Sequence, residues 1–106
     1  MDQAIQKKVD EIVRRIIDAL HPLRIILFGS AARGQMGPNS DLDILVVMPE
    51  GTHRRHTAMS LYPLMKGLGV PVDFVVATPS DLERHKNSWC LVYSHALREG
   101  KELYAT

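Results

Sequence analysis

Two carboxylates, Asp41 and Asp43, stand one residue apart at the start of an apolar run, residues 44–47. Side chains along a strand alternate between faces, so both aspartates are expected to point the same way. Neighbouring carboxylates repel each other unless a cation lies between them, and hard oxygen ligands of this kind suit Mg²⁺. Gly29 and Ser30 end another apolar run, separated from Asp41 by ten residues. Glycine lets a ligand approach the backbone, and a helix beginning at Ser30 would offer N–H groups to phosphate, so the pattern indicates nucleotide chemistry.

A third carboxylate, Asp73, lies in the middle of the apolar run at residues 70–78. Burying a carboxylate costs several kcal/mol unless it is charge-paired or metal-bound. Asp73 is therefore either a metal ligand or the partner of an arginine such as Arg33. Asp81 is the competing third carboxylate, although its place at a helix start is explained by capping alone.

The pattern of apolar residues predicts the elements that position these side chains. Apolar residues recur at three- and four-residue steps over residues 3–20, which predicts an amphipathic helix that ends before Pro22. Continuous apolar runs predict strands at residues 23–28, 42–48 and 70–78. Between the first two strands, a short helix is expected at residues 31–34 and a loop at residues 35–40.

The second half of the chain predicts further helices. Residues 52–68 favour a helix that Pro63 should kink or break. His53 and His56 near its start are either metal ligands or a solvated helix start, and the two arginines between them favour the latter. A helix is expected to begin near residue 79, and a last helix contains Trp89, Val92, Tyr93, Ala96 and Leu97. Gly100 is its expected C-cap, residues 101–104 form a closing extension, and Cys90 packs beside Trp89.

Size and composition indicate one ordinary globular domain spanning residues 1–106. The predicted strands and helices together indicate an α/β fold with a small mixed sheet packed with helices. The formal net charge of +1 gives no reason to expect broad binding to nucleic acid or to membranes. A single cysteine excludes a disulfide framework within the chain. The polar N-terminus and the absence of a run of about 20 apolar residues favour a cytoplasmic protein.

The two motifs together resemble the signature of the DNA polymerase beta-like nucleotidyltransferase superfamily. Gly29-Ser30 and Asp41-x-Asp43 have the spacing of that signature, and each is flanked by a predicted strand. The sequences ARG at residues 32–34 and SDLDILV at residues 40–46 resemble its smallest branch, the minimal nucleotidyltransferases, many of which are paired with HEPN-type toxins. The chain lacks the Gly-Lys-Ser/Thr of a Walker A sequence, which disfavours a kinase or a motor ATPase.

The resemblance implies a nucleotidyltransferase fold and a reaction that uses two Mg²⁺ ions, or Mn²⁺, with ATP as the substrate. Asp41, Asp43 and Asp73 would be the catalytic metal ligands, and Asp73 would also activate the acceptor hydroxyl. Gly29 and Ser30 would hold the nucleotide phosphates. Arg33 would bind phosphate or form a structural ion pair with a neighbouring aspartate.

The resemblance also implies an acceptor, and two alternatives stand beside it. The implied acceptor is a hydroxyl of a HEPN-type toxin, which would receive AMP and make this chain an antitoxin in a homo- or hetero-oligomer. One alternative is a non-catalytic subunit that neutralises its partner by contact. The other is a small-molecule nucleotidyltransferase of the antibiotic-modifying kind.

Overall fold

A four-stranded mixed sheet with the strand order β3-β2-β1-β4 is the centre of the computed structural model. The structure describes residues 3–34, 40–85 and 92–106, with α4 side chains described from Ala96 on. Strand β1 (Arg24–Phe28) is antiparallel to β2 (Leu42–Val47) and to β4 (Lys101–Ala105). Strand β3 (Val72–Ala77) runs parallel to β2. The expected α/β fold with a small mixed sheet is confirmed.

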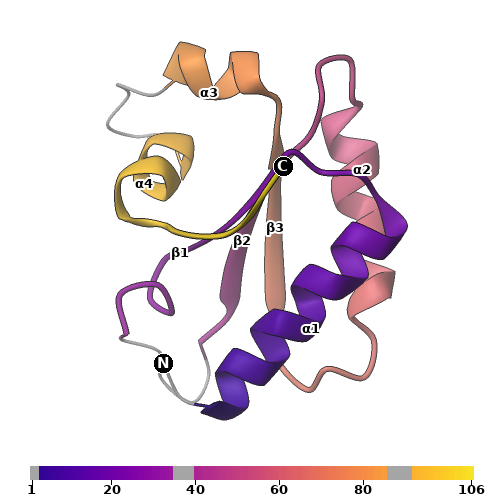
Figure 1. The fold of residues 1–106 in the computed structure, drawn as a ribbon, viewed down its shortest axis with the longest axis vertical. Coiled ribbons are helices and arrows are strands. Elements are labelled where there is room, and N and C mark those ends of the chain that lie inside the picture. The colour runs from indigo at the N-terminus through magenta and orange to yellow at the C-terminus, as the bar shows by residue number, and fades with distance from the viewer. Residues whose placement is uncertain (1–2, 35–39, 86–91) are drawn as a thin grey trace.

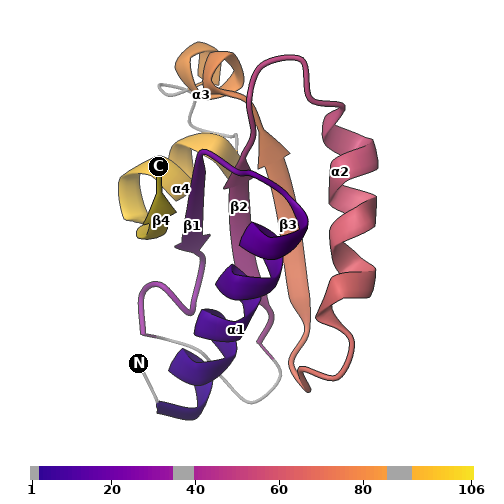
Figure 2. The same cartoon turned by 45° about the vertical axis from the view of Figure 1, so that its right-hand side comes forward.

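Helices cover both faces of this sheet (Figures 1 and 2). On one face lie α1 (Gln3–Ala19), α2 (Arg54–Leu61) and the short 3₁₀ helix η1 (Tyr62–Met65). On the other face lie α3 (Pro79–His85) and α4 (Val92–Glu99), which rest against the upper part of the sheet in Figure 2. The end of β1 and the beginnings of β2 and β3 lie at the opposite, lower end of the sheet.

Strands β1, β2 and β3 each contribute to two apolar cores, because their side chains alternate between the faces. In β2, Leu42, Ile44 and Val46 belong to the larger core, beneath α1 and α2. Leu45 and Val47 belong to the smaller core, beneath α3 and α4. By the same alternation Asp43 lies on the face of the smaller core, at the end of the sheet away from α3. The larger core also contains Val9, Ile12, Ile16, Ile25, Leu27, Leu61, Phe74 and Val76.

Most of the predicted elements are confirmed, and the short helix expected at residues 31–34 is wrong. This segment is a hydrogen-bonded turn, in which the Arg33 N–H donates to the Gly29 carbonyl at 3.3 Å and the Gly34 N–H to the Ala31 carbonyl at 3.2 Å. Gly34 has a φ of 71°, which ends the turn before a second helical turn forms. Because there is no helix here, a helix dipole cannot contribute to phosphate binding at Ser30.

The expected break at Pro63 is confirmed. Helix α2 ends at Leu61, and Pro63 lies in the first turn of the 3₁₀ helix that follows it, where its missing N–H removes no α-helical bond. His53 is the N-cap of α2, since its Nδ1 accepts the His56 N–H at 3.1 Å. Residues 53–56 are exposed, so the expected solvated helix start is confirmed.

Residues 101–104 are more than a closing extension, because they form most of the edge strand β4. Gly100 connects α4 to this strand directly and does not have the positive φ expected of a glycine C-cap. Its N–H donates to the Ala96 carbonyl at 2.9 Å. A Cβ at this position would lie 2.2 Å from that oxygen and 2.4 Å from Cγ2 of Ile26, so close packing explains the glycine. Trp89 and Cys90 lie outside the described residues.

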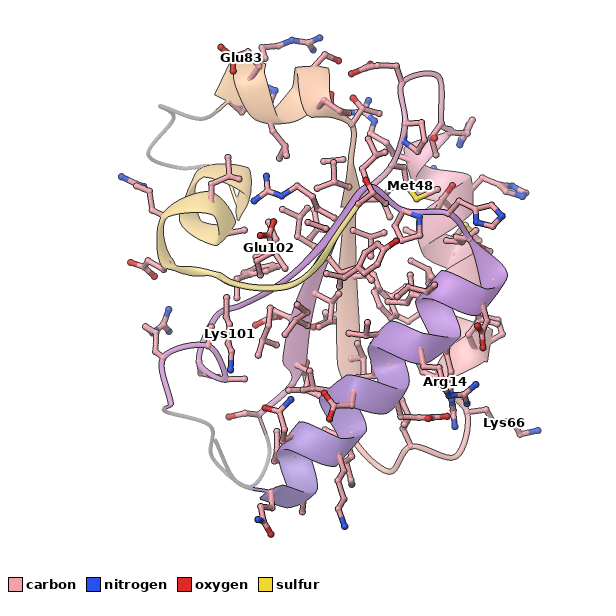
Figure 3. The ribbon with its side chains drawn as sticks, viewed as in Figure 1. Arg14, Met48, Lys66, Glu83, Lys101 and Glu102 are labelled. Carbon is pink, nitrogen blue, oxygen red and sulfur yellow. The ribbon has the colours of Figure 1, made fainter. Side chains whose placement is uncertain are left out.

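Arg15 joins α1 to the 3₁₀ helix and gives a stability prediction with a matched control. Its guanidinium donates to the carbonyls of Leu64 at 2.8 Å and Lys66 at 3.0 Å, with 27% of the side chain exposed. The neighbouring Arg14 lies at the outer surface of α1, 61% exposed, and makes only ion pairs with acidic residues of the same helix (Figure 3). We expect Arg15→Met to lower the free energy of unfolding by about 2 kcal/mol and Arg14→Met by less than about 1 kcal/mol. Equal urea-unfolding midpoints of the two variants would contradict this assignment.

Within the ranges that the structure describes, no helix is long and apolar enough to cross a membrane.

Candidate active site

The parallel pairing of β2 with β3 brings two of the predicted carboxylates together. Asp43 and Asp73 are directly opposed in the register of these strands, so their side chains lie on the same face of the sheet. Asp41, just before β2, contacts the same group, since its carboxyl group is hydrogen-bonded to that of Asp73. Asp41 and Asp73 are exposed and Asp43 is half-buried. Three carboxylates thus form one cluster, although about thirty residues separate the third from the pair.

The electrostatics of this cluster disfavour negative charge. Partial burial raises the pKa of Asp43, and the negative charges of Asp73 and Asp41 raise it further, while Arg33 lowers it. Burial also raises the pKa of Asp73, and the hydrogen bond with Asp41 and the negative charge of Asp41 raise it further. The cluster therefore favours a proton or a cation at this end of the sheet.

Gly29 lies against the Asp43 carboxylate, at the end of β1. Phe28 is the register partner of Asp43, and Gly29 follows it with a φ of 75°. A Cβ on Gly29 would lie 2.2 Å from Oδ2 of Asp43, so any larger residue would displace that carboxylate. The glycine was predicted to let a ligand approach, and the structure adds that its missing side chain also makes room for Asp43. Ser30 follows directly and is half-buried.

Arg33, in the turn after Ser30, pairs with a residue that the sequence did not indicate. Its Nη1 lies 3.3 Å from Oε2 of Glu99, at the end of α4, and both side chains are about half exposed. The charge of Arg33 also acts on a neighbouring aspartate, since it lowers the pKa of Asp43. A pair this exposed is held weakly, so Arg33 can exchange Glu99 for another anion at little cost.

Asp81, the competing third carboxylate, has a structural role at the other end of β3. It forms a capping box with Thr78, in which the Thr78 N–H donates to Oδ2 of Asp81 at 2.9 Å and the Asp81 N–H donates to Oγ1 of Thr78 at 3.4 Å. Its Oδ1 accepts from Nη1 of Arg54 at 3.0 Å, which ties the start of α2 to the start of α3. Asp81 is only 5% exposed.

The capping box gives a pH-dependent prediction. The pKa of Asp81 is lowered most by the hydrogen bond from the Thr78 N–H. The hydrogen bond from the Thr78 hydroxyl and the positive charge of Arg54 lower it further. A carboxyl whose pKa is lowered by folding stabilises the fold above its unfolded pKa of about 3.9, and this contribution is lost as the pH falls through the folded pKa. Asp81→Asn should therefore cost about 1–3 kcal/mol at pH 7, and the difference should shrink in urea unfolding below about pH 3.9. An Asp18→Asn control, on an exposed ion pair, should change little at either pH.

The aspartate cluster fits a divalent cation in donor type and in charge. Carboxylate oxygens are the ligands that Mg²⁺ and Mn²⁺ prefer, and a cation would relieve the repulsion that raises the pKa of Asp43. As the side chains lie, however, no three Asp, Glu, His or Cys residues of the described part of the chain are arranged as a metal-binding set. The donors are therefore gathered in one place without the geometry of a completed site.

Comparison with known proteins identifies the family. The nucleotidyltransferase domain family matches residues 7–101, nearly the whole chain, and the chain belongs to that family. Its fold is similar to a chain of a toxin–antitoxin crystal structure with AMP-PNP, with 26% sequence identity and a TM-score of 0.70, covering 92% of this chain and 73% of that one. No curated protein matches the sequence significantly.

Two further structures share the fold at lower identity. A chain of the toxin–antitoxin MntA-HepT is 24% identical with a TM-score of 0.65, and the match covers 95% of this chain and 73% of that one. A protein from Sulfolobus solfataricus is 21% identical with a TM-score of 0.62, and the match covers 99% of this chain and 89% of that one. Identities this low establish the fold and not the activity.

Proposed function

We propose that this nucleotidyltransferase, acting in the cytoplasm as a single domain, moves AMP from ATP onto a hydroxyl group of a partner protein. The partner is of the HEPN toxin class, so that the modification makes this chain an antitoxin. The observation that carries the proposal is the cluster of Asp41, Asp43 and Asp73 on neighbouring parallel strands beside Gly29. The similarity to a chain of a toxin–antitoxin structure that contains AMP-PNP supports both the nucleotide and the kind of partner.

In the reaction, the acceptor oxygen bonds to the α-phosphorus while the bond from that phosphorus to the pyrophosphate oxygen breaks. Asp73 would take the proton of the acceptor hydroxyl. Asp41, Asp43 and Asp73 would hold two Mg²⁺ or Mn²⁺ ions, which neutralise charge on the phosphate oxygens and lower the pKa of the hydroxyl.

Three other residues would hold the nucleotide in place. Gly29 and Ser30 bind the β- and γ-phosphates through their backbone N–H groups and the serine hydroxyl. Arg33 leaves its exposed pair with Glu99 and binds the leaving pyrophosphate, which carries more negative charge than one carboxylate. The pairing of β1 with β2 places Gly29 beside Asp43.

Mass spectrometry of the intact acceptor tests the proposal. The purified chain is mixed with ATP, Mg²⁺ and a HEPN-type candidate acceptor, such as the product of any adjacent reading frame. We expect the acceptor to gain the mass of one AMP, and this gain to require both ATP and Mg²⁺. An acceptor that is neutralised at unchanged mass would show inhibition by contact, and nucleotide found on an added aminoglycoside would show a small-molecule transferase.

A further inference from the structure

The segment that forms α2 and η1 is basic in a nearly neutral chain. Residues 51–72 contain no aspartate or glutamate, while Arg54, Arg55 and Lys66 give them a charge of +3 within a chain of net charge +1. Arg54 is engaged by Asp81, whereas Arg55 is exposed and Lys66 points away from the molecule (Figure 3). The surface over this segment is therefore complementary to an acidic partner.

The same segment exposes large apolar side chains. Met59 is 64% exposed and Tyr62 is 46% exposed, and they are the large hydrophobic residues that stand out to solvent in the described part of the chain. With Arg55 they are spaced at steps of four and three residues, so the three side chains form one stripe along the helix. Methionine, tyrosine and arginine are the residue types enriched at the centres of protein interfaces.

Tyr62 is held rigidly in this stripe. Its hydroxyl accepts the Phe74 N–H at 3.3 Å, and its ring packs edge-to-face on the Phe74 ring with the centroids 5.3 Å apart. An anchor that is already fixed in the free protein loses little conformational entropy on binding. The contact also ties the stripe to β3, the edge strand that carries Asp73.

A hollow of about 510 Å³ lies at the basic end of the stripe, lined by Thr52, His53, Arg54, Arg55 and Val76. Val76 belongs to β3, so the hollow opens beside the same edge strand. Arg54 in this lining is paired with Asp81, so the exposed Arg55 and His53 are the groups that suit a partner carboxylate entering beside the apolar stripe.

From these features we infer that the stripe Arg55–Met59–Tyr62 and the adjoining hollow dock the acceptor protein through an apolar patch flanked by carboxylates. This inference rests on the proposed function, because the acceptor is the partner protein of the transfer reaction. A partner bound here lies along the β3 edge of the sheet, and Asp73 is exposed on the opposite face of that strand, nearer its start than the hollow is. RNA fits the stripe less well, since its one aromatic ring is already packed on Phe74 and its most exposed residue is Met59.

Charge reversal at the stripe tests the inference without disturbing the fold. Arg55→Glu places an acid in the first turn of α2, where the helix dipole favours it, and Met59→Glu changes a side chain that is already in solvent. Binding of the same HEPN-type acceptor is measured by calorimetry. Each variant should raise the Kd at least about tenfold, while Lys7→Glu, an exposed charge reversal on α1, should leave it unchanged.

Three further readouts separate docking from catalysis and from RNA binding. In the transfer reaction the stripe variants should raise the KM for the acceptor at unchanged kcat, and Arg55→Glu should reduce the salt dependence of binding. The inference would be overturned if both variants bound the acceptor with wild-type affinity, or if the wild type did not bind it. It would also be overturned if the variants lost binding to an RNA oligonucleotide and not to the acceptor. If AMP is transferred but the stripe variants bind the acceptor normally, the docking inference fails and the proposed function stands. If binding depends on the stripe but no AMP is transferred, the proposed function fails and the docking surface stands.

Discussion

Replacing Asp41 and Asp43 together by alanine should lower the transfer of AMP to the acceptor by at least about 10³-fold, which corresponds to about 4 kcal/mol of transition-state stabilisation. The two carboxylates would bind the cations that neutralise the reacting phosphate, and the remaining Asp73 cannot hold them alone. Label transfer from ATP, followed over time at saturating acceptor, measures the effect.

The double variant should remain folded, so that its loss of activity can be assigned to the site. Asp41 is exposed and Asp43 is half-buried beside two other acids, so their removal relieves repulsion and leaves no large cavity. It should also bind the acceptor with wild-type affinity, because the Arg55–Met59–Tyr62 stripe is intact. Asp18→Ala is the control for the loss of an exposed carboxylate. Transfer at the wild-type rate by the folded double variant would remove these two aspartates from the mechanism.

Mg²⁺ with a non-hydrolysable ATP analogue should stabilise the wild-type chain by about 2.7 kcal/mol at a free concentration of 100 times its Kd. For a domain of this size, such a gain raises the melting temperature by about 10 °C or more. Asp43→Asn should lose most of this shift, because it removes one negative ligand from the cluster. Differential scanning fluorimetry of both proteins, with and without ligand, measures it. An equal shift in the two proteins would contradict the role of Asp43.

Without ligand, the same Asp43→Asn substitution should raise the melting temperature by a few degrees at neutral pH. The pKa of Asp43 is raised in the folded state, so ionising it costs stability, and this cost grows as the pH rises from the unfolded pKa of about 3.9 toward the folded pKa. Below that range both states hold the proton and the two proteins should differ little. An advantage of the variant that persisted in acid would have a cause other than charge repulsion.

Local physics accounts for the parts of the fold that the sequence predicts well. The helix at residues 3–20 and the three buried strands follow from periodicity and apolar runs, and the break at Pro63 follows from its missing N–H. The turn at residues 31–34 was predicted as a helix because short segments carry no period to test. Strand β4 is short and polar, and its pairing with β1 comes from a contact distant in sequence.

The site was only partly predictable, because contacts between residues distant in sequence assemble it. Asp41 and Asp43 share a face by strand geometry, but nothing local places Asp73 beside them, because the parallel pairing of β2 with β3 is a long-range contact. The family resemblance supplied that expectation. Neither the Glu99 partner of Arg33 nor the contact of Gly29 with the Asp43 carboxylate leaves a pattern in the sequence.

The position of the label in ATP tests the nucleotidyl transfer itself most directly. Parallel reactions contain the chain, Mg²⁺, the HEPN-type acceptor and ATP labelled on either the α- or the γ-phosphate. Label from the α-phosphate should appear on the acceptor and disappear with the Asp41 and Asp43 double variant. Label from the γ-phosphate should never appear there, because it leaves with pyrophosphate. Transfer of the γ-label to the acceptor would show a kinase and contradict the proposed chemistry.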